Sequence, residues 1–292
     1  MQEIAKIFSC AESEIKNIEP LKIGATNHSF TFSFENTKYI MRVPGEGTDM
    51  LINRGQEYDI YQMVAPLGLC DDIIHIDPET GYKITKYIEN VRTCDPFSAS
   101  DVKACMKKLK EFHNMNLECS HTFDIFERIE FYESLWHTRK SIFKDYEQTK
   151  ANVLKLRNYI ESTPKGWTLT HIDPNNDNFL FEETDAGTKI RLIDWEYTGM
   201  QDPHVDIAMF AVYAMYDREY VESLIDSYFE TGEPSPCLPE VRRKIYAYIA
   251  MCGLLWSNWC EYKRHLGVEF GEFSLRQYRF AKDYYRIFDE TR

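Results

Sequence analysis

The chain has 292 residues, which is enough for one large domain or for two lobes with a sizeable buried core. Its 34 Lys and Arg face 47 Asp and Glu, and the formal net charge of −13 argues against nucleic acid or an anionic membrane surface as a partner. The sequence shows no signal-peptide pattern, no apolar run long enough to span a bilayer and no CxxC pair among its eight cysteines. We therefore expect a cytoplasmic protein with reduced thiols and no integral membrane segment, and nothing in the chain indicates an oligomeric state.

The first ninety residues change from helical spacing to strand alternation. Apolar residues at helical spacing in residues 1–18 predict one or two lead-in helices. Alternating apolar residues then predict five strands, at positions 21–23, 29–34, 38–43, 73–76 and 82–88. Between the third and fourth strands, a helix is expected to begin at about Asn53, with Gln56 in capping-box register.

Three strands, one helix and two strands is the order of elements in the small lobe of a protein kinase. We therefore predict an ATP-binding lobe over residues 1–89, built as a five-stranded antiparallel sheet with one helix. In such a lobe, the turn between the first two strands covers the nucleotide phosphates with backbone N–H groups. Here that turn contains Gly24, Thr26, Asn27 and Ser29, although a single glycine is also compatible with a plain hairpin turn.

Two charged residues of this lobe are candidates for phosphate binding. Arg42 is on the third strand, where a protein kinase carries its phosphate-pairing lysine, and Glu57 on the following helix would orient it. A guanidinium is always charged and contacts two phosphate oxygens at once, so the exchange is chemically sound. Two solvated surface charges are the alternative. We expect Lys86, Tyr87 and Ile88 to form the hinge whose backbone groups contact adenine.

The rest of the chain, residues 90–292, predicts a mainly α-helical lobe. Ser98 and Asp101 fit a capping box for a helix that reaches about Met115. Further helices are expected at residues 129–160, 207–216, 240–266 and 274–289. The predicted fold class is therefore α+β, with two lobes as in the protein kinases.

One hairpin of the second lobe carries the chemistry. His171-Ile172-Asp173 is followed five residues later by Asn178, and an apolar strand ends at Asp194. Phosphotransferases of the protein-kinase type use this order, because an Asp accepts the proton of the attacking hydroxyl while an Asn and a strand-end Asp hold Mg²⁺. We predict Asp173, Asn178 and Asp194 as catalytic residues, with Asn178 and Asp194 as the metal ligands. A solvated polar hairpin is the alternative.

His-x-Asp-(x4)-Asn followed by Ile-Asp-Trp-Glu resembles the aminoglycoside-phosphotransferase and choline-kinase superfamily, and most closely its choline/ethanolamine kinases. The resemblance implies a kinase-like fold and transfer of the γ-phosphoryl group of MgATP to the hydroxyl of a small amino alcohol, such as choline. Choline kinases carry a Gly-x-Thr-Asn segment after the first strand and an Arg at the position of Arg42, which supports both assignments. The resemblance also gives Asp206 a role in bracing the catalytic loop, whereas its position favours a cap for the helix at 207–216, which we take as the expectation.

The acceptor is expected to be a small molecule. Only eleven residues separate Asp194 from Asp206, too few for the activation segment with which protein kinases bind peptides. Leu255-Trp256-Ser257 and Glu269-Phe270-Gly271 resemble the choline-kinase segment whose aromatic faces line the choline site, although aromatic residues at helical spacing are also typical of a core. Aromatic faces and negative charge must recognise a quaternary ammonium, which has no N–H to donate. The candidate aromatic residues are Tyr197, Tyr213, Tyr216, Trp256 and Trp259, and the candidate charges are Asp173 and Glu196.

Three alternatives stay open: an ethanolamine kinase, an aminoglycoside kinase and a nucleotide-binding pseudoenzyme. An aminoglycoside is a polycation and would need several carboxylates near the acceptor loop, whereas the candidates here are aromatic. The intact Asp173, Asn178 and Asp194 argue against a pseudoenzyme.

Overall fold

The computed structural model describes residues 1–21, 27–45, 47–48, 50–136, 140–185, 187–230 and 236–291. These form two compact units, and the first consists of Met1–Thr93 and Asn178–Thr198. The second consists of Cys94–Asp177 and Gly199–Arg292. The hairpin at 178–198 therefore groups with the N-terminal sheet, whereas a lobe boundary at residue 89 would assign it to the C-terminal lobe. Its first strand pairs with the strand Val91–Thr93, which ends the N-terminal part of the first unit, and this pairing explains the grouping.

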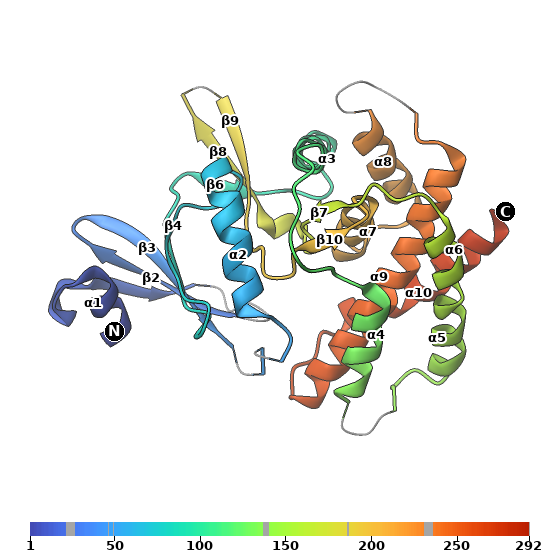
Figure 1. Cartoon of the computed structure of the whole chain (residues 1–292), viewed down its shortest axis with the longest axis horizontal. Helices are drawn as coiled ribbons and strands as arrows, with labels where there is room; N and C mark the ends of the chain where they lie inside the picture. The colour runs from blue at the N-terminus through green and yellow to red at the C-terminus, as the bar shows by residue number, and fades with distance from the viewer. Residues whose placement is uncertain are drawn as a thin grey trace. The chain divides into compact units, whose positions relative to one another are not determined.

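The first unit contains two sheets (Figure 1). Its elements in chain order are α1 (Gln2–Phe8), η1 (Glu12–Glu14), β1 (Lys16–Pro20), β2 (Asn27–Phe34), β3 (Thr37–Pro44), α2 (Arg54–Val64), η2 (Ala65–Leu67), β4 (Ile73–Ile76), β5 (Lys83–Lys86), β6 (Val91–Thr93), β8 (Phe179–Thr184) and β9 (Gly187–Leu192). The larger sheet is antiparallel and has the order β1-β2-β3-β5-β4, and the smaller has the order β6-β8-β9. The five-stranded antiparallel sheet is confirmed.

The start of the chain differs from the prediction. Helical spacing over residues 1–18 predicted one or two lead-in helices, and α1 and the short η1 form there, but β1 occupies Lys16–Pro20 and pairs with β2. Ile15 is buried beside Ile4 in the core of this sheet, whereas Ile18 is 47% exposed. The spacing of the two isoleucines therefore mimicked a helix, while an exposed edge strand needs no apolar alternation to pair. The strand predicted at 21–23 is not formed at Leu21, and its other two residues lie outside the described chain.

The second unit is mainly helical, as predicted. Its elements are α3 (Ala99–His113), α4 (Ile125–Ser134), α5 (Tyr146–Leu154), α6 (Leu156–Ser162), β7 (Thr168–Thr170), β10 (Gly199–Gln201), α7 (His204–Tyr213), α8 (Arg218–Phe229), α9 (Pro239–His265) and α10 (Glu272–Glu290). The single 3₁₀ turn η3 (Asn176–Asn178) carries the chain from this unit into the first. In the described part of the chain, no helix is both long and apolar enough to cross a bilayer.

Helix α9 is the centre of the second unit, and it packs against α4, α7 and α10 (Figure 1). Pro239 stands in its first turn, where the missing N–H costs no hydrogen bond, and every residue from Lys244 to Lys263 is buried. A Cβ on Gly253 would lie 2.7 Å from the backbone of Gln277 and Ala281, so this glycine lets α10 approach closely. The long C-terminal helix predicted at 240–266 is confirmed.

The helix predicted at 129–160 is wrong, because the chain breaks it after Ser134. Asp124 starts α4 earlier than expected, since its carboxylate accepts the N–H groups of the first turn. After the break, the buried Glu261 carboxylate accepts hydrogen bonds from the Ser141 hydroxyl and the Ile142 N–H, both at 2.8 Å. Two long-range hydrogen bonds thus hold a loop where the local pattern alone favours a helix.

Candidate active site

An arginine–glutamate pair lies in the core of the first unit. Arg42 of β3 donates two hydrogen bonds to the Glu57 carboxylate, one of them at 2.9 Å, and a third to the Gly81 carbonyl at 3.0 Å. Helix α2 presents Glu57 in its first turn because the Asn53 side chain caps the helix at the Gln56 N–H, 3.1 Å away. The predicted partnership of Arg42 with Glu57 is therefore formed, with both side chains buried.

Both members of this pair are charged. Burial would lower the pKa of Arg42, but the adjacent Glu57 more than offsets it, and the net pKa is raised well above the usual range. Burial would likewise raise the pKa of Glu57, but the Arg42 guanidinium outweighs it and the pKa is lowered. A bidentate guanidinium–carboxylate contact of this kind fixes direction as well as charge.

A second buried arginine, Arg54, shares these carboxylates, and the sequence analysis missed it. Its Nη1 donates to Glu57 Oε2 at 2.9 Å and to Glu196 Oε2 at 3.1 Å. The Asn27 amide donates to the same Glu196 oxygen at 3.0 Å. Burial, and then the charge of Asp194, raise the pKa of Glu196. The available signal was the i,i+3 spacing of Arg54 and Glu57 on a predicted helix, which is common on helix surfaces and says nothing of Glu196.

Asp194 stands at the turn that follows β9, close to this cluster. Its side chain is 31% exposed, and it lies 3.8 Å from Arg42 Nη1. The Ile193 N–H donates to the Asn178 carbonyl at 2.9 Å, which joins the two predicted metal-binding segments. Oxygens of Glu57, Asp194 and Glu196 lie within 4.8 Å of one another, an arrangement that suits a hard divalent cation. Glu196, which we predicted to contact the acceptor, therefore forms ion pairs with Arg42 and Arg54.

The predicted nucleotide contacts fall on two segments of the larger sheet. Ser29 lies on β2 opposite Arg42, whereas Gly24 and Thr26 lie outside the described residues. In the predicted hinge, the Lys86 N–H donates to Asp72 and the Tyr87 N–H to Lys38, both at 2.9 Å. Ile88 is half-buried, and it follows directly in the chain. Since two hinge N–H groups already have protein acceptors, they are not available to adenine.

The predicted base, Asp173, lies in the second unit, in the loop after β7. The preceding residue, Ile172, has a φ of 70°, which is an outlier for a β-branched side chain. Asp206 accepts the Ile172 N–H at 2.7 Å and the His171 N–H at 3.0 Å. His113 Nε2 lies 2.9 Å from the same carboxylate. Asp206 therefore braces the loop that carries Asp173.

The expectation that Asp206 caps its own helix is wrong. Helix α7 begins at His204, three residues earlier than a cap at Asp206 requires, and its N-cap residue Pro203 makes no side-chain cap. The Asp206 carboxylate is completely buried, and it hydrogen-bonds the loop and His113. Spacing alone could not separate the two roles, because an Asp in the first turn of a helix suits both.

Comparison with known proteins decides the family. A family model described as choline/ethanolamine kinase matches residues 18–233. The chain belongs to this family. Protein LicA of Haemophilus influenzae is 25% identical to it over 263 residues, which cover 87% of this chain and 76% of that protein. The chain is accordingly a choline kinase-like phosphotransferase that acts on an alcohol group.

Solved structures show the same architecture. The choline kinase LicA from Streptococcus pneumoniae has a TM-score of 0.80 and 27% identity, with 98% of this chain and 97% of that chain covered. A structure of LicA in complex with AMP has a TM-score of 0.79 at 27% identity and covers 98% of each chain. The aminoglycoside phosphotransferase APH(4)-Ia, at 15% identity, covers 98% of this chain and 97% of its own and shares the fold with a TM-score of 0.66. The kinase-like fold predicted from the catalytic hairpin is confirmed.

Three of the aromatic residues predicted for the acceptor lie together in the second unit. The Trp256 ring is 5.3 Å from the Tyr213 ring and 5.7 Å from the Trp259 ring, centroid to centroid. Trp259 also contacts Phe270 of the second predicted segment, at 5.0 Å. Trp256 is 3% exposed, and its indole N–H donates to the Met209 sulfur at 3.1 Å. Residues 43 positions apart on α7 and α9 thus form one aromatic group.

Two other candidates lie elsewhere. Tyr216 donates to the Pro96 carbonyl and stacks with Tyr220, and it borders a pocket of about 310 Å³ that four arginines also line. Three carboxylates, those of Asp217, Asp283 and Glu290, line it as well. Tyr197 is buried in the first unit, two residues beyond the tryptophan Trp195 that donates its indole N–H to Leu192.

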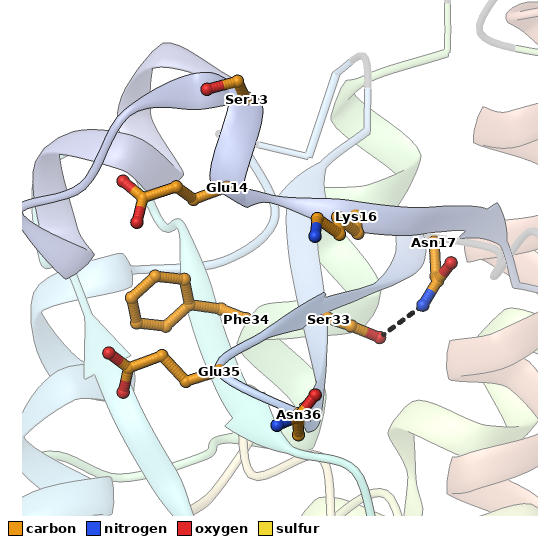
Figure 2. Close-up of a pocket in the computed structure, with 8 residues that line it drawn as sticks. All are labelled: Ser13, Glu14, Lys16, Asn17, Ser33, Phe34, Glu35 and Asn36. Carbon is orange, nitrogen blue, oxygen red and sulfur yellow. Dashed lines mark hydrogen bonds between the residues drawn. The ribbon is translucent and has the colours of Figure 1, made fainter.

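A larger pocket, of about 480 Å³, opens at the edge of the five-stranded sheet (Figure 2). The Asn17 amide donates to the Ser33 hydroxyl at 3.3 Å across it, and Phe34 presents its ring beside two glutamates. The lining residues are Ser13, Glu14, Lys16, Asn17, Ser33, Phe34, Glu35 and Asn36. None of them is a predicted site residue, so cavity size does not locate the chemistry here.

Proposed function

We propose that the chain transfers the γ-phosphoryl group of MgATP to the hydroxyl of choline. The observation that carries the choice of acceptor is the aromatic group of the half-buried Tyr213 and the buried Trp256 and Trp259. A quaternary ammonium offers no N–H, so aromatic faces are its main source of attraction, and each contributes about 0.5–2 kcal/mol. The name of the structural relative, a choline kinase, supports the same acceptor.

Asp173 acts as the base in this proposal. Its carboxylate orients the choline hydroxyl and takes its proton as the oxygen attacks the γ-phosphorus, and ADP leaves. The brace from Asp206 at Ile172 holds the loop in the left-handed conformation that presents this carboxylate. The small size of the acceptor agrees with the short connection between Asp194 and Asp206.

Asn178 and Asp194 would hold Mg²⁺. Their oxygens are the hard ligands that this ion prefers. The partly exposed Asp194 carboxylate belongs to a cluster of three carboxylates, with Glu57 and Glu196, and two arginines, Arg42 and Arg54. When bound, Mg²⁺ neutralises charge on the phosphates. Glu57 directs the Arg42 guanidinium, and Asn27, Ser29 and Ile88 are the described residues proposed for the remaining nucleotide contacts.

The reaction is proposed to take place in the cytoplasm, where ATP is available. All eight cysteines are free thiols, in agreement with a reducing compartment.

Release of ADP on adding choline tests the proposal. Purified protein is supplied with MgATP and, in separate assays, with choline, ethanolamine or an aminoglycoside. We expect the highest kcat/KM with choline. Ethanolamine has a primary ammonium that can donate hydrogen bonds, so a preference for it would point to carboxylates rather than rings as the main recognition. Absence of ADP release with every acceptor would identify a nucleotide-binding pseudoenzyme.

A further inference from the structure

The backbone at Asp194 is held in an unusual conformation. Its φ is 66°, in the left-handed region that side chains other than glycine occupy rarely. Residues persist there only when their surroundings over-determine the conformation. On the N-terminal side, the Ile193 N–H is tied to the Asn178 carbonyl at 2.9 Å. The structure must therefore also hold the chain on the C-terminal side of Asp194.

Glu196 supplies that second attachment. It follows Asp194 by two residues, is 7% exposed, and its Oε2 accepts from Arg54 at 3.1 Å and from Asn27 at 3.0 Å. Both partners come from elements far away in the sequence, β2 and the first turn of α2. The turn that carries Asp194 is thus pinned at both ends.

Arg54 is the guanidinium that hydrogen-bonds Glu196, whereas Arg42 forms a longer ion pair with it. Arg42 Nη1 is 3.6 Å from Glu196, and its hydrogen bonds go to Glu57 and Gly81. The Gly81 position also accommodates Arg54, because a Cβ there would lie 2.7 Å from Arg54 Cδ and Nε. Arg54 is itself only 7% exposed, so the surrounding residues fix the position of its side chain.

We propose that Arg54 is a positioning residue for Asp194: by binding Glu196, it holds the left-handed turn that presents the Asp194 carboxylate to the metal. The inference rests on the proposed role of Asp194 in holding Mg²⁺. Without Arg54, Glu196 loses a charged hydrogen-bond donor and the turn can relax to an ordinary φ, which redirects the Asp194 side chain. Arg54 itself touches neither the acceptor nor the transferred group in this proposal.

The test compares Arg54→Met with Arg191→Met. Arg191 is a matched control, because it is also buried in the first unit and also bridges two carboxylates, Glu182 at 2.8 Å and Asp72 at 2.9 Å. Calorimetry measures ADP binding as Mg²⁺ is titrated, with no acceptor present. We expect Arg54→Met to raise the Mg²⁺ concentration needed for half-maximal binding by roughly 10- to 100-fold. Arg191→Met should lower thermal stability to a similar extent and leave this concentration unchanged. Equal effects of the two substitutions would overturn the proposal.

The route through Glu196 is tested by a double substitution. If Arg54 acts through Glu196, Arg54→Met combined with Glu196→Gln should be no worse in Mg²⁺ dependence than Glu196→Gln alone, and additive losses would contradict that route. If Arg54→Met does not fold, Arg54→Lys carries the test. It keeps the charge but replaces a planar fork with one ammonium, and an unchanged Mg²⁺ dependence would overturn the proposal.

Kinetic constants separate this inference from the proposed function. We expect Arg54→Lys to lower kcat and to leave the choline KM unchanged. A wild-type protein that releases no ADP with choline would contradict the proposed function, while the acceptor-free binding comparison would still decide the role of Arg54.

Discussion

In two turns of this protein, a carboxylate that we propose to be catalytic lies on, or directly after, a residue with left-handed backbone. One is Ile172, with φ 70°, which precedes Asp173 in the second unit. The other is Asp194 itself, with φ 66°, in the first unit. Such conformations cost about 1–3 kcal/mol each, and they occur mainly at functional sites.

The two turns are held in chemically opposite ways. At Ile172 the brace is an anion, since the Asp206 carboxylate accepts two backbone N–H groups directly. At Asp194 it is a cation, Arg54, which acts on the side chain of Glu196. Asp206 binds the main chain directly, so substitutions of Asp206 should be poorly tolerated. Arg54 acts on its turn only through the side chain of Glu196. In both, the bracing residue is remote in sequence, 34 and 142 positions from the group it binds.

Removing the Asp194 carboxylate should have the largest effect. We expect Asp194→Ala to abolish Mg²⁺-dependent ADP release, because the metal loses its exposed ligand, while the protein stays folded. Circular dichroism and the melting temperature check the fold. An unfolded variant would show that Asp194 is a structural residue and not a metal ligand.

Removing the proposed proton acceptor at the other turn should have the next largest effect. Asp173→Asn keeps the size of the side chain but cannot take the hydroxyl proton, so kcat should fall by roughly 10²-fold or more. Binding of MgADP should stay near the wild-type value, in contrast to Asp194→Ala. Near-normal turnover in this variant would rule out Asp173 as the base.

Weakening the anionic brace should have an intermediate effect. Asp206→Asn keeps one acceptor oxygen for the His171 and Ile172 N–H groups, so the loop is misplaced rather than lost, and kcat should fall by roughly 10- to 100-fold. Hydrogen bonds to charged groups contribute about 1.5–3 kcal/mol, so the free energy of unfolding should fall by about 2 kcal/mol. Stopped-assay kinetics and urea unfolding measure the two quantities.

Asp202→Asn is the matched control. Asp202 is just as buried, in the same corner of the unit, but it binds Lys244 at 2.7 Å instead of the catalytic loop. Burial would raise its pKa, and the bonds to His204 and Lys244 outweigh that effect and lower it. The stability that it contributes is therefore present above its unfolded pKa of about 3.9 and is lost only as the pH falls below it. At pH 7, Asp202→Asn should lower the stability but hardly change kcat. An equal loss of kcat in both variants would show that Asp206 contributes to packing in general and not to positioning the loop.

Candidate reactive groups can be proposed from the sequence, whereas the residues that hold their loops in place cannot. The order and spacing of Asp173, Asn178 and Asp194 obey the chemistry of phosphoryl transfer, which constrains residue type. The bracing residues, Arg54 and Asp206, are constrained only by geometry. Any buried arginine or aspartate whose side chain reaches the turn could take the same role. Arg54 therefore went unnoticed, and Asp206 was assigned to its own helix.

The same division applies to the secondary structure. Asn53 and Ser98 were correctly predicted as helix caps, because a cap and its N–H partner lie within one turn. The break after Ser134 was not predicted, because it is held by Glu261, more than 100 residues later. Local hydrogen bonds leave a local pattern, whereas contacts across the fold do not.

The smallest expected effect concerns acceptor binding. It should change the KM for choline and not the KM for ATP, and it should come from a residue of the second unit alone. Trp256→Leu keeps an apolar side chain beside Met209 but removes the ring from the group with Tyr213 and Trp259. If that group binds the ammonium, the choline KM should rise by roughly tenfold, or about 1.4 kcal/mol, through loss of one cation–π contact. The ATP KM should stay constant. The control is Trp195→Leu, which removes an equally buried tryptophan from the first unit and should not change the choline KM. If Trp256→Leu lowers only the melting temperature, this tryptophan is core packing, and choline would have to be recognised by negative charge instead.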